Sequence, residues 1–182
     1  MRQSANRASL ASLVAATALA AIYGIRRYLH RVKRKWPLLG VEVRRSHIRA
    51  AGDGLFASVD RQAGTVLGEY RGRVLSLLQA TRLKDRDYLM GGFGLNAHVD
   101  ARFALTAPGR YVNDNFDTAA LNAEFHKDRE TRTATLVATR DIRRGEEIYA
   151  SYGESYWSAR GIDPITGKAL AAEPEAASAA SQ

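Results

Sequence analysis

The segment R-R-G-E-E-I-Y-A-S-Y-G-E-S-Y-W, residues 143–157, places four aromatic residues after the acidic pair Glu146 and Glu147. Their spacings of three, four and one fit neither a single helical stripe nor the alternation of a strand. Two interpretations are open at this point: a strand followed by an aromatic plug in the core, or an aromatic channel with a phenol at its base. The four aromatic residues are Tyr149, Tyr152, Tyr156 and Trp157.

The composition limits the classes of protein to which the chain can belong. Its 182 residues are enough for one domain with a hydrophobic core. It has no cysteine, which excludes disulfides, iron–sulfur clusters and cysteine-ligated zinc. The four histidines are scattered without the spacing of metal ligands, so we expect no metal site.

The net charge of +8 is confined to the beginning of the chain. Residues 1–41 carry 8 of the 27 basic residues and no acid, so the other 19 basic residues balance all 19 acids. Residues 42–182 therefore have no net charge, and we expect no direct nucleic-acid binding by this part of the protein.

Residues 1–40 form a basic and apolar leader. Its uncharged run, residues 10–25, is shorter than the roughly 20 apolar residues of a spanning helix. A basic flank follows, which would keep the rest of the chain on the cytosolic side of a membrane. The leader is thus a candidate membrane anchor, an organelle transit peptide or a solvated helix, and nuclear action stays possible. The break at Trp36 and Pro37 predicts a linker before a domain that begins at Val41.

The rest of the chain predicts a mainly β fold of several small sheets with few helices. Residues 75–90 form the one convincing helical stretch after the leader, and residues 52–54 form a turn. The low-complexity tail from Gly167 predicts disorder. The expected strands are residues 41–45, 64–70, 133–140 and 147–151.

Four motifs follow one another in a characteristic order. They are S-H-I-R-A-A-G-D-G-L-F-A-S (46–58), E-Y-R-G (69–72), G-R-Y-V-N-D-N-F (109–116) and G-E-E-I-Y-A-S-Y-G (145–153). Together they resemble the SET domain of protein lysine methyltransferases over residues 41–157, closest to the minimal SET proteins of viral or microbial type. The resemblance implies a β-clip-like fold with a knot-like C-terminal threading, in which the Asn113 and Tyr152 segments meet.

The resemblance implies S-adenosylmethionine as cofactor. Glycines in the first motif let the backbone approach a flat ligand, and the amide of Asn113 can donate and accept hydrogen bonds. The sequence departs from the family at Asp114, where most members have histidine, and a three-residue insertion separates Asn113 from Asn122. The implied cofactor-binding residues are Gly52, Asp53, Gly54, Leu55, Asn113, Asp114 and Tyr152.

The catalytic residue implied by the resemblance is Tyr152. Methyl transfer to an amine is an in-line displacement, so the protein must align the donor carbon with a neutral nitrogen in an apolar channel. We expect Glu146 and Glu147 to hold a turn or to pair with Arg143 or Arg144. The implied walls of the lysine channel are Tyr70, Tyr149, Tyr156 and Trp157.

Many relatives close this channel with a cysteine-rich zinc cluster, which this chain cannot form. We expect Tyr156 and Trp157, with residues 162–164, to serve as a lid, so that residues 158–182 comprise a lid segment and a tail. The predicted function is methylation of a lysine on a histone tail or another basic protein. The alternative is a catalytically silent SET module that binds proteins and is tethered by its leader, and a homodimer is possible in either case.

Overall fold

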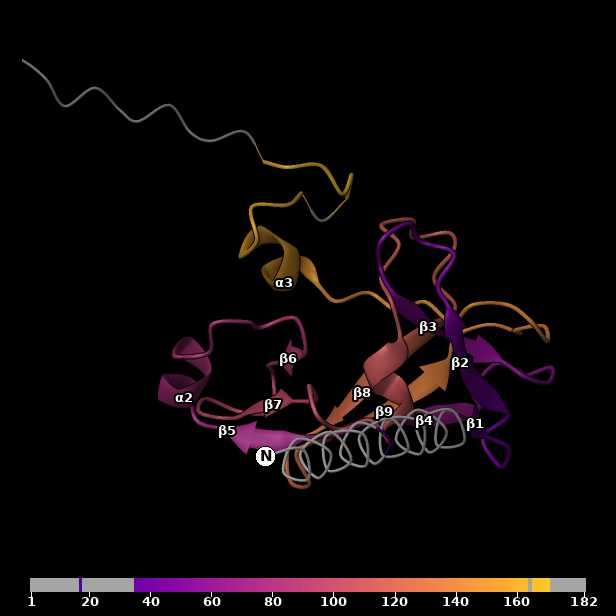
Figure 1. The fold of residues 1–182 in the computed structure, drawn as a ribbon, viewed down its shortest axis with the longest axis horizontal. Coiled ribbons are helices and arrows are strands. Elements are labelled where there is room, and N and C mark those ends of the chain that lie inside the picture. The colour runs from indigo at the N-terminus through magenta and orange to yellow at the C-terminus, as the bar shows by residue number, and fades with distance from the viewer. Residues whose placement is uncertain (1–16, 18–34, 164, 171–182) are drawn as a thin grey trace, which may run out of the picture.

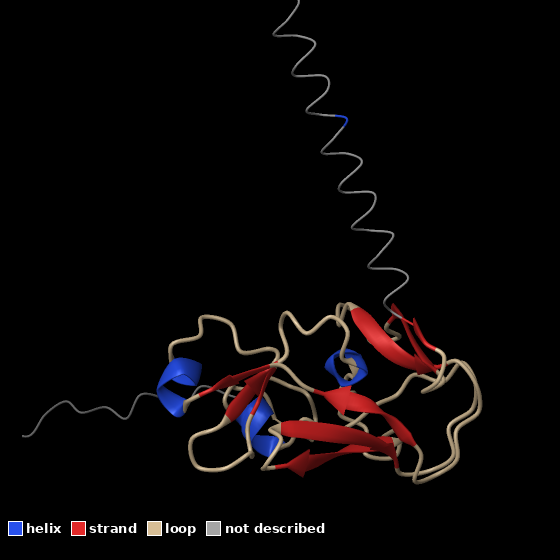
Figure 2. Ribbon diagram, turned by 90° about the horizontal axis from the view of Figure 1, so that it is seen from below, coloured by secondary structure: helices blue, strands red, loops and turns tan. Residues whose placement is uncertain are grey.

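The computed structural model describes residue 17, residues 35–163 and residues 165–170 (Figure 1). Strands predominate in this part of the chain and the helices are short (Figure 2). The elements are β1 (Lys35–Trp36), β2 (Val41–Arg45), β3 (Asp53–Ala57), β4 (Val66–Tyr70), β5 (Arg73–Leu75), α2 (Leu77–Thr81), β6 (Leu89–Met90), β7 (His98–Asp100), η1 (Pro108–Tyr111), β8 (Ala123–Asp128), β9 (Thr133–Ala138) and α3 (Glu154–Ser158).

The strands form three antiparallel sheets of three strands each, in the orders β1-β2-β3, β4-β9-β8 and β5-β7-β6. Figure 1 shows the first sheet at one end of the molecule and the third sheet, with α2, at the other. The β4-β9-β8 sheet lies between them. The prediction of a mainly β fold built from several small sheets is confirmed.

The strands follow the alternation of apolar residues in the sequence. In β9 the side chains of Ala134, Leu136 and Ala138 are buried, while the residues between them are half-buried. This strand pairs with β4 on one side and β8 on the other, so its pattern fixes the register of the whole sheet. The bounds of β2 are those predicted, and β9 ends two residues before the predicted Arg140.

Two clusters of buried side chains hold the sheets together. The first joins β3, β9 and the segment around Ile148, and the second lies under β7. The largest fully buried members of the first cluster are Leu55, Leu67, Leu136, Ile142 and Ile148, and those of the second are Phe93 and Val99.

The predicted helix over residues 75–90 is wrong for most of its length. Only Leu77–Thr81 is helical, after a capping box in which Ser76 and Gln79 bond each other's backbone. Leu77 and Leu78 are 52% and 60% exposed, so the leucines of this stretch do not form a buried helical face. The chain beyond Thr81 forms a loop that leads into β6.

The expectation that Trp36 and Pro37 form a linker is also wrong. Lys35 and Trp36 make up β1, which pairs with β2 in the register Lys35↔Glu42 and Trp36↔Val41. The indole ring packs against the first cluster, and its centroid lies 6.2 Å from that of Tyr111. The partly buried indole therefore makes β1 part of the folded domain.

The predictions for the leader fall largely outside the described residues. Its apolar run, residues 10–25, is not described apart from Thr17, and neither is the basic flank before Lys35. Among residues 17, 35–163 and 165–170, no helix has the length and apolar character needed to cross a bilayer.

The segment after the turn at residues 143–145 pairs through single bridges and does not form the predicted strand over residues 147–151. Glu147 bridges Phe56, and Tyr149 forms a parallel bridge to Asn113. The amide of Ala150 donates to the carbonyl of Asn113 at 3.1 Å. The Asn113 segment and the segment that leads to Tyr152 therefore lie side by side, as the family resemblance predicted.

The beginning of the predicted disordered tail is ordered. The amide of Asp163 donates to the carbonyl of Lys168 at 2.8 Å, and the amide of Leu170 donates to the carbonyl of Gly161 at 2.7 Å. The prediction of disorder is thus wrong for residues 167–170, because backbone hydrogen bonds return this segment to the end of α3. Residues 171–182 lie outside the described part of the chain.

Candidate active site

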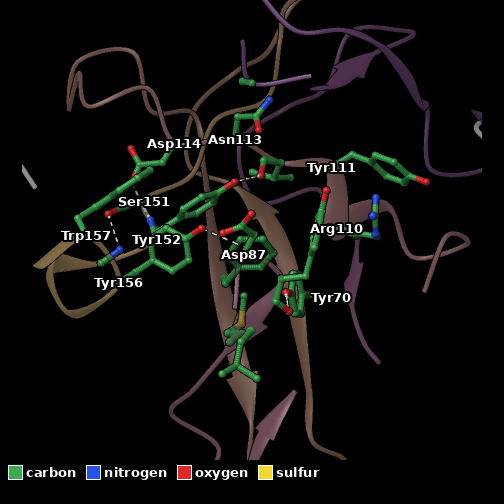
Figure 3. A pocket seen from close by; sticks show the side chains of 18 of the residues that line it. Tyr70, Asp87, Arg110, Tyr111, Asn113, Asp114, Ser151, Tyr152, Tyr156 and Trp157 are labelled. Atoms are coloured by element: carbon green, nitrogen blue, oxygen red, sulfur yellow. Dashed lines mark hydrogen bonds between the residues drawn. The ribbon is translucent and has the colours of Figure 1, made fainter. Parts of the chain in front are cut away.

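A cleft of about 1430 Å³ opens between segments that are far apart in the sequence (Figure 3). Pockets that hold small ligands have volumes of about 300–1,000 Å³, so this cleft has room for a cofactor together with part of a second molecule. Its principal walls are residues 48–53, 86–92, 109–114 and 151–157, and Tyr70 and Arg160 also line it.

The first motif contributes Gly52 and Asp53 to the cleft. Gly52 has a φ of +82°, a conformation that favours glycine, and a Cβ at this position would meet no atom within 4 Å. The backbone is therefore bare and open to a ligand at this point. Leu55 does not line the cleft; it is fully buried in the first core cluster. Leu55 was predicted to bind the cofactor, but β3 carries its side chain into the core and away from the cleft.

Gly54 does not line the cleft either, and a glycine is required at this position for another reason. A Cβ on Gly54 would overlap the carboxylate of Glu147 behind the strand. The prediction of a direct contact between Gly54 and the cofactor is therefore not supported, and the glycine instead permits close packing.

Asn113 lines the cleft and connects two of its walls. Its Nδ2 donates to the carbonyl of Asp53 at 3.1 Å and to Oε1 of Glu147 at 3.2 Å. None of the described residues donates to Oδ1 of Asn113, so this oxygen is available to a hydrogen-bond donor on a ligand.

Glu147 is the central residue of the hydrogen-bond network behind Asn113. The sequence did not reveal this role. Glu147 is only 3% exposed, yet its two oxygens accept four hydrogen bonds. The donors are the hydroxyls of Ser46 (2.6 Å) and Tyr149 (2.8 Å), the amide of His47 (2.7 Å) and Nδ2 of Asn113 (3.2 Å). The one local signal was its place in G-E-E-I, directly before the buried Ile148.

The two acidic residues of G-E-E-I thus differ in role. Glu146 holds a turn, as predicted, because its Oε2 accepts the amide of Arg143 at 2.8 Å. The predicted pairing of Glu147 with Arg143 or Arg144 is wrong, since its partners come from the first motif and from Asn113.

Tyr149 lies outside the cleft. Its hydroxyl donates to Oε2 of Glu147 at 2.8 Å, and burial, followed by this carboxylate, raises the pKa of the phenol. The prediction that Tyr149 forms a wall of the lysine channel is wrong, because the hydrogen bond turns its ring toward the network behind β3.

Tyr152 lies in the cleft, and its hydroxyl donates to the carbonyl of Val112 at 2.7 Å. Its ring is stacked on Trp157, with centroids 5.5 Å apart and an interplanar angle of 15°. It meets Tyr156 edge to face at 4.7 Å. Burial raises the pKa of Tyr152, and the nearby phenols of Tyr156 and Tyr70 raise it further. The hydroxyl therefore stays protonated at neutral pH.

Tyr70 completes an aromatic wall opposite these residues. Figure 3 shows Tyr152, Tyr156 and Trp157 together on one side of the pocket, with Tyr70 across from them. Tyr70 is 7% exposed, and burial raises the pKa of its phenol. Its hydroxyl donates to the carbonyl of Tyr88. Tyr88 also lines the cleft. The sequence did not indicate this position, because Tyr88 lies in the stretch that was predicted as a helix.

The predicted lid corresponds to α3 and the residues that follow it. Tyr156 donates from its hydroxyl to the carbonyl of Asp87 at 3.3 Å. The guanidinium of Arg160 lies 3.6 Å from the centre of the Tyr156 ring and 3.5 Å from Oδ1 of Asp87. These contacts hold α3 next to β6 (Figure 1). Ile162, a predicted part of the lid, does not line the cleft, and Pro164 lies outside the described residues.

A comparison with known protein families matches residues 52–153 to the SET domain. The match covers more than half of the 182 residues and includes the walls that carry Gly52, Asn113 and Tyr152. The chain belongs to the SET-domain family. SET domains are generally protein lysine methyltransferases, and SET-domain methyltransferases generally use S-adenosylmethionine. The likeness of this SET domain to the minimal viral or microbial type stays a prediction.

Proposed function

We propose that this SET domain transfers a methyl group from S-adenosylmethionine to the side-chain amine of a protein lysine. The observation that carries the proposal is the position of Tyr152. Its phenol lies in a cleft that is also lined by the bare backbone of Gly52, the amide of Asn113 and the rings of Tyr70 and Tyr156.

The cleft fits the cofactor. Gly52 leaves room for a ligand against the backbone, and Oδ1 of Asn113 is free to accept from an ammonium group. Aromatic rings attract a cation such as a sulfonium, and the rings of Tyr70, Tyr152 and Tyr156 line the cleft. We infer that Gly52, Asp53 and Asn113 would hold the cofactor in this SET domain. When bound, S-adenosylmethionine supplies an electrophilic methyl group.

Tyr152 would orient the reacting groups and would not act as a base. Its proton is engaged with the carbonyl of Val112, which leaves the oxygen lone pairs free to accept from an amine or a polarised methyl group. Because burial raises its pKa, the residue does not ionise near neutral pH. An in-line displacement needs alignment and no strong base once the amine is neutral.

The aromatic walls would prepare the lysine. A free lysine amine has a pKa of about 10.4, and desolvation between the rings of Tyr70 and Tyr156 disfavours its charged form. The hydroxyls of both tyrosines are engaged by backbone carbonyls, so the rings are held in place. We propose a histone tail or another lysine-bearing protein as the substrate.

The alternative is a catalytically silent SET module that binds a protein while its leader tethers it. The feature that favours it is Asp114, which replaces the usual histidine of the family. Intact Tyr152 and Asn113 favour the enzyme.

Two measurements separate the alternatives. Calorimetric titration with S-adenosylmethionine tests cofactor binding, and transfer of a labelled methyl group to histone and proteome peptides tests activity. Binding with transfer, both absent in a heat-denatured control, supports the enzyme. Binding without transfer to any peptide would favour the silent module, and absence of both would reject methyl transfer.

A further inference from the structure

The carboxylate of Asp114 contacts both the segment of the catalytic tyrosine and the lid. Oδ2 of Asp114 accepts from the backbone amide of Tyr152 at 2.8 Å and from the indole Nε1 of Trp157 at 2.9 Å. Its Oδ1 accepts from the amide of Phe116 at 3.1 Å. One side chain therefore connects three parts of the cleft wall (Figure 3).

The indole of Trp157 packs against two aromatic rings at this point. Its ring is stacked on that of Tyr152, and its centroid lies 4.4 Å from that of Phe116. Phe116 has a φ of +61°, a strained conformation for a bulky residue, and its amide is the one bonded to Asp114. The ring of Phe116 also packs closely against Gly167, where a Cβ would come within 3.0 Å.

The contacts require an acceptor-only side chain at position 114. All three partners of Asp114 are N–H donors, so an amide of the same shape would place its own NH₂ group against a donor. Among the described residues no lysine or arginine pairs with Asp114, so these donors are the groups that stabilise its charge. A histidine ring, usual in the family, cannot offer two acceptor oxygens to the same three donors.

We propose that Asp114 is a positioning residue that fastens the lid helix α3 to the segment of Tyr152. Through it, the stack of Tyr152 and Trp157 stands in place before the substrate arrives. In many relatives a cysteine-rich zinc cluster completes the channel, and in this chain, which has no cysteine, a carboxylate, an indole and the strained Phe116 meet at the cleft wall. The effect on catalysis rests on the proposed function, whereas the fastening contact itself does not.

The contact is tested by the indole N–H signals in ¹⁵N-edited NMR spectra of the full chain. The protein has two tryptophans, so Trp36→Phe and Trp157→Phe assign the two signals. Asp114→Ala removes both acceptor oxygens, so it should shift the Trp157 signal and speed its exchange with water, while the Trp36 signal stays unchanged. Asp117→Ala is the matched control, because Asp117 is exposed in the same loop and does not line the cleft.

The effect on positioning is tested by methyl transfer. Asp114→Ala should lower kcat by about tenfold, with a smaller change in the KM for S-adenosylmethionine. Trp157→Phe keeps an aromatic ring but removes the N–H donor, and it should also lower kcat. In the Trp157→Phe background, Asp114→Ala should then cost less than it does in the wild type, because part of its effect passes through the indole contact.

The outcomes separate the two proposals. An unchanged Trp157 signal in Asp114→Ala would overturn the fastening contact, whatever the activity. Full kcat in Trp157→Phe, or additive losses in the double variant, would overturn the positioning role, and the Trp157→Phe measurement holds even if Asp114→Ala fails to fold. If the wild-type protein transfers no methyl group, the proposed function fails, while the indole signal still decides the contact.

Discussion

The backbone of Gly54 passes so close to the carboxylate of Glu147 that a Cβ at residue 54 would overlap Oε1. The same carboxylate accepts the hydroxyl of Ser46 and the side-chain amide of Asn113. A buried charge thus holds the first motif against the Asn113 segment from behind, while Gly52 faces the cleft. The two glycines of this motif therefore differ in role: Gly52 leaves space for a ligand, and Gly54 allows close packing against Glu147.

Glu147→Gln should destabilise the domain and weaken cofactor binding. Each oxygen of Glu147 accepts two donors, so an NH₂ group in place of either oxygen leaves two buried donors without a partner. We expect the free energy of unfolding to fall by about 2 kcal/mol or more, measured by urea denaturation. Glu146→Gln is the control, because the amide oxygen of glutamine can still accept from Arg143. Equal stability of the two variants would contradict the central role of Glu147.

Alanine at the two glycines should separate stability from ligand binding. Gly54→Ala forces its Cβ onto Glu147 and should cost about 3 kcal/mol of stability. Gly52→Ala meets no atom, so its cost is the roughly 1–2 kcal/mol of a left-handed alanine. Its methyl group projects into the cleft and should weaken S-adenosylmethionine binding by about tenfold. Thermal unfolding and calorimetry measure the two effects, and the reverse pattern would refute this assignment of the glycines.

Tyr152→Phe should abolish most methyl transfer and leave cofactor binding nearly intact. The hydroxyl lies in the cleft at the carbonyl of Val112, whereas those of Tyr70 and Tyr156 are held at other carbonyls and should not replace it. We expect a fall in kcat of about 10²-fold or more, measured by single-turnover transfer. Tyr149→Phe is the informative comparison, because it removes a hydroxyl outside the cleft and should act on cofactor affinity through Glu147. Full activity of Tyr152→Phe would end the catalytic assignment.

Asn113→Ala should weaken S-adenosylmethionine binding by about 2 kcal/mol or more, because the ligand loses an acceptor and Glu147 loses a donor. Calorimetry of the variant measures the change. Asn115→Ala is the matched control, since Asn115 belongs to the same motif but does not line the cleft. Unchanged affinity in Asn113→Ala would mean that the segment is a structural turn.

Two truncations should define where the folded domain begins. A chain that starts at Lys35 keeps β1 and should fold and bind cofactor, whereas one that starts at Val41 loses the contact of Trp36 with Tyr111. We expect the shorter chain to be less stable by about 2 kcal/mol in urea denaturation. Identical stabilities would show that β1 adds nothing to the domain.

The leader should direct the protein to a membrane or an organelle. We propose this from its excess charge and its apolar run, and fractionation of cells that express the full chain or the chain from Lys35 tests it. The full chain should sediment with membranes or an organelle, and the shorter chain should be diffuse. The same distribution for both forms would remove the leader's targeting role.

Much of the fold was determined by local features of the sequence. The alternation in β2 and β9 records which face of each strand is buried, and this is a property of neighbouring residues. The order of the four motifs identified the family and placed Tyr152, Gly52 and Asn113 at the cleft. The helix over residues 75–90 failed because Leu75 pairs in β5 while Leu77 and Leu78 have no apolar partner surface, which no local pattern reveals.

Other features were decided only by the tertiary structure. Tyr149 and Tyr152 are three residues apart and chemically identical, yet one bonds Glu147 behind the cleft and the other lies within it. Trp36 looked like part of a linker until β2 offered it a strand to pair with. Glu147 finds Ser46 101 positions away in the chain. Periodicity determines whether a side chain is buried, but the partner that satisfies a buried polar group comes from a distant segment, so the sequence alone could not name it.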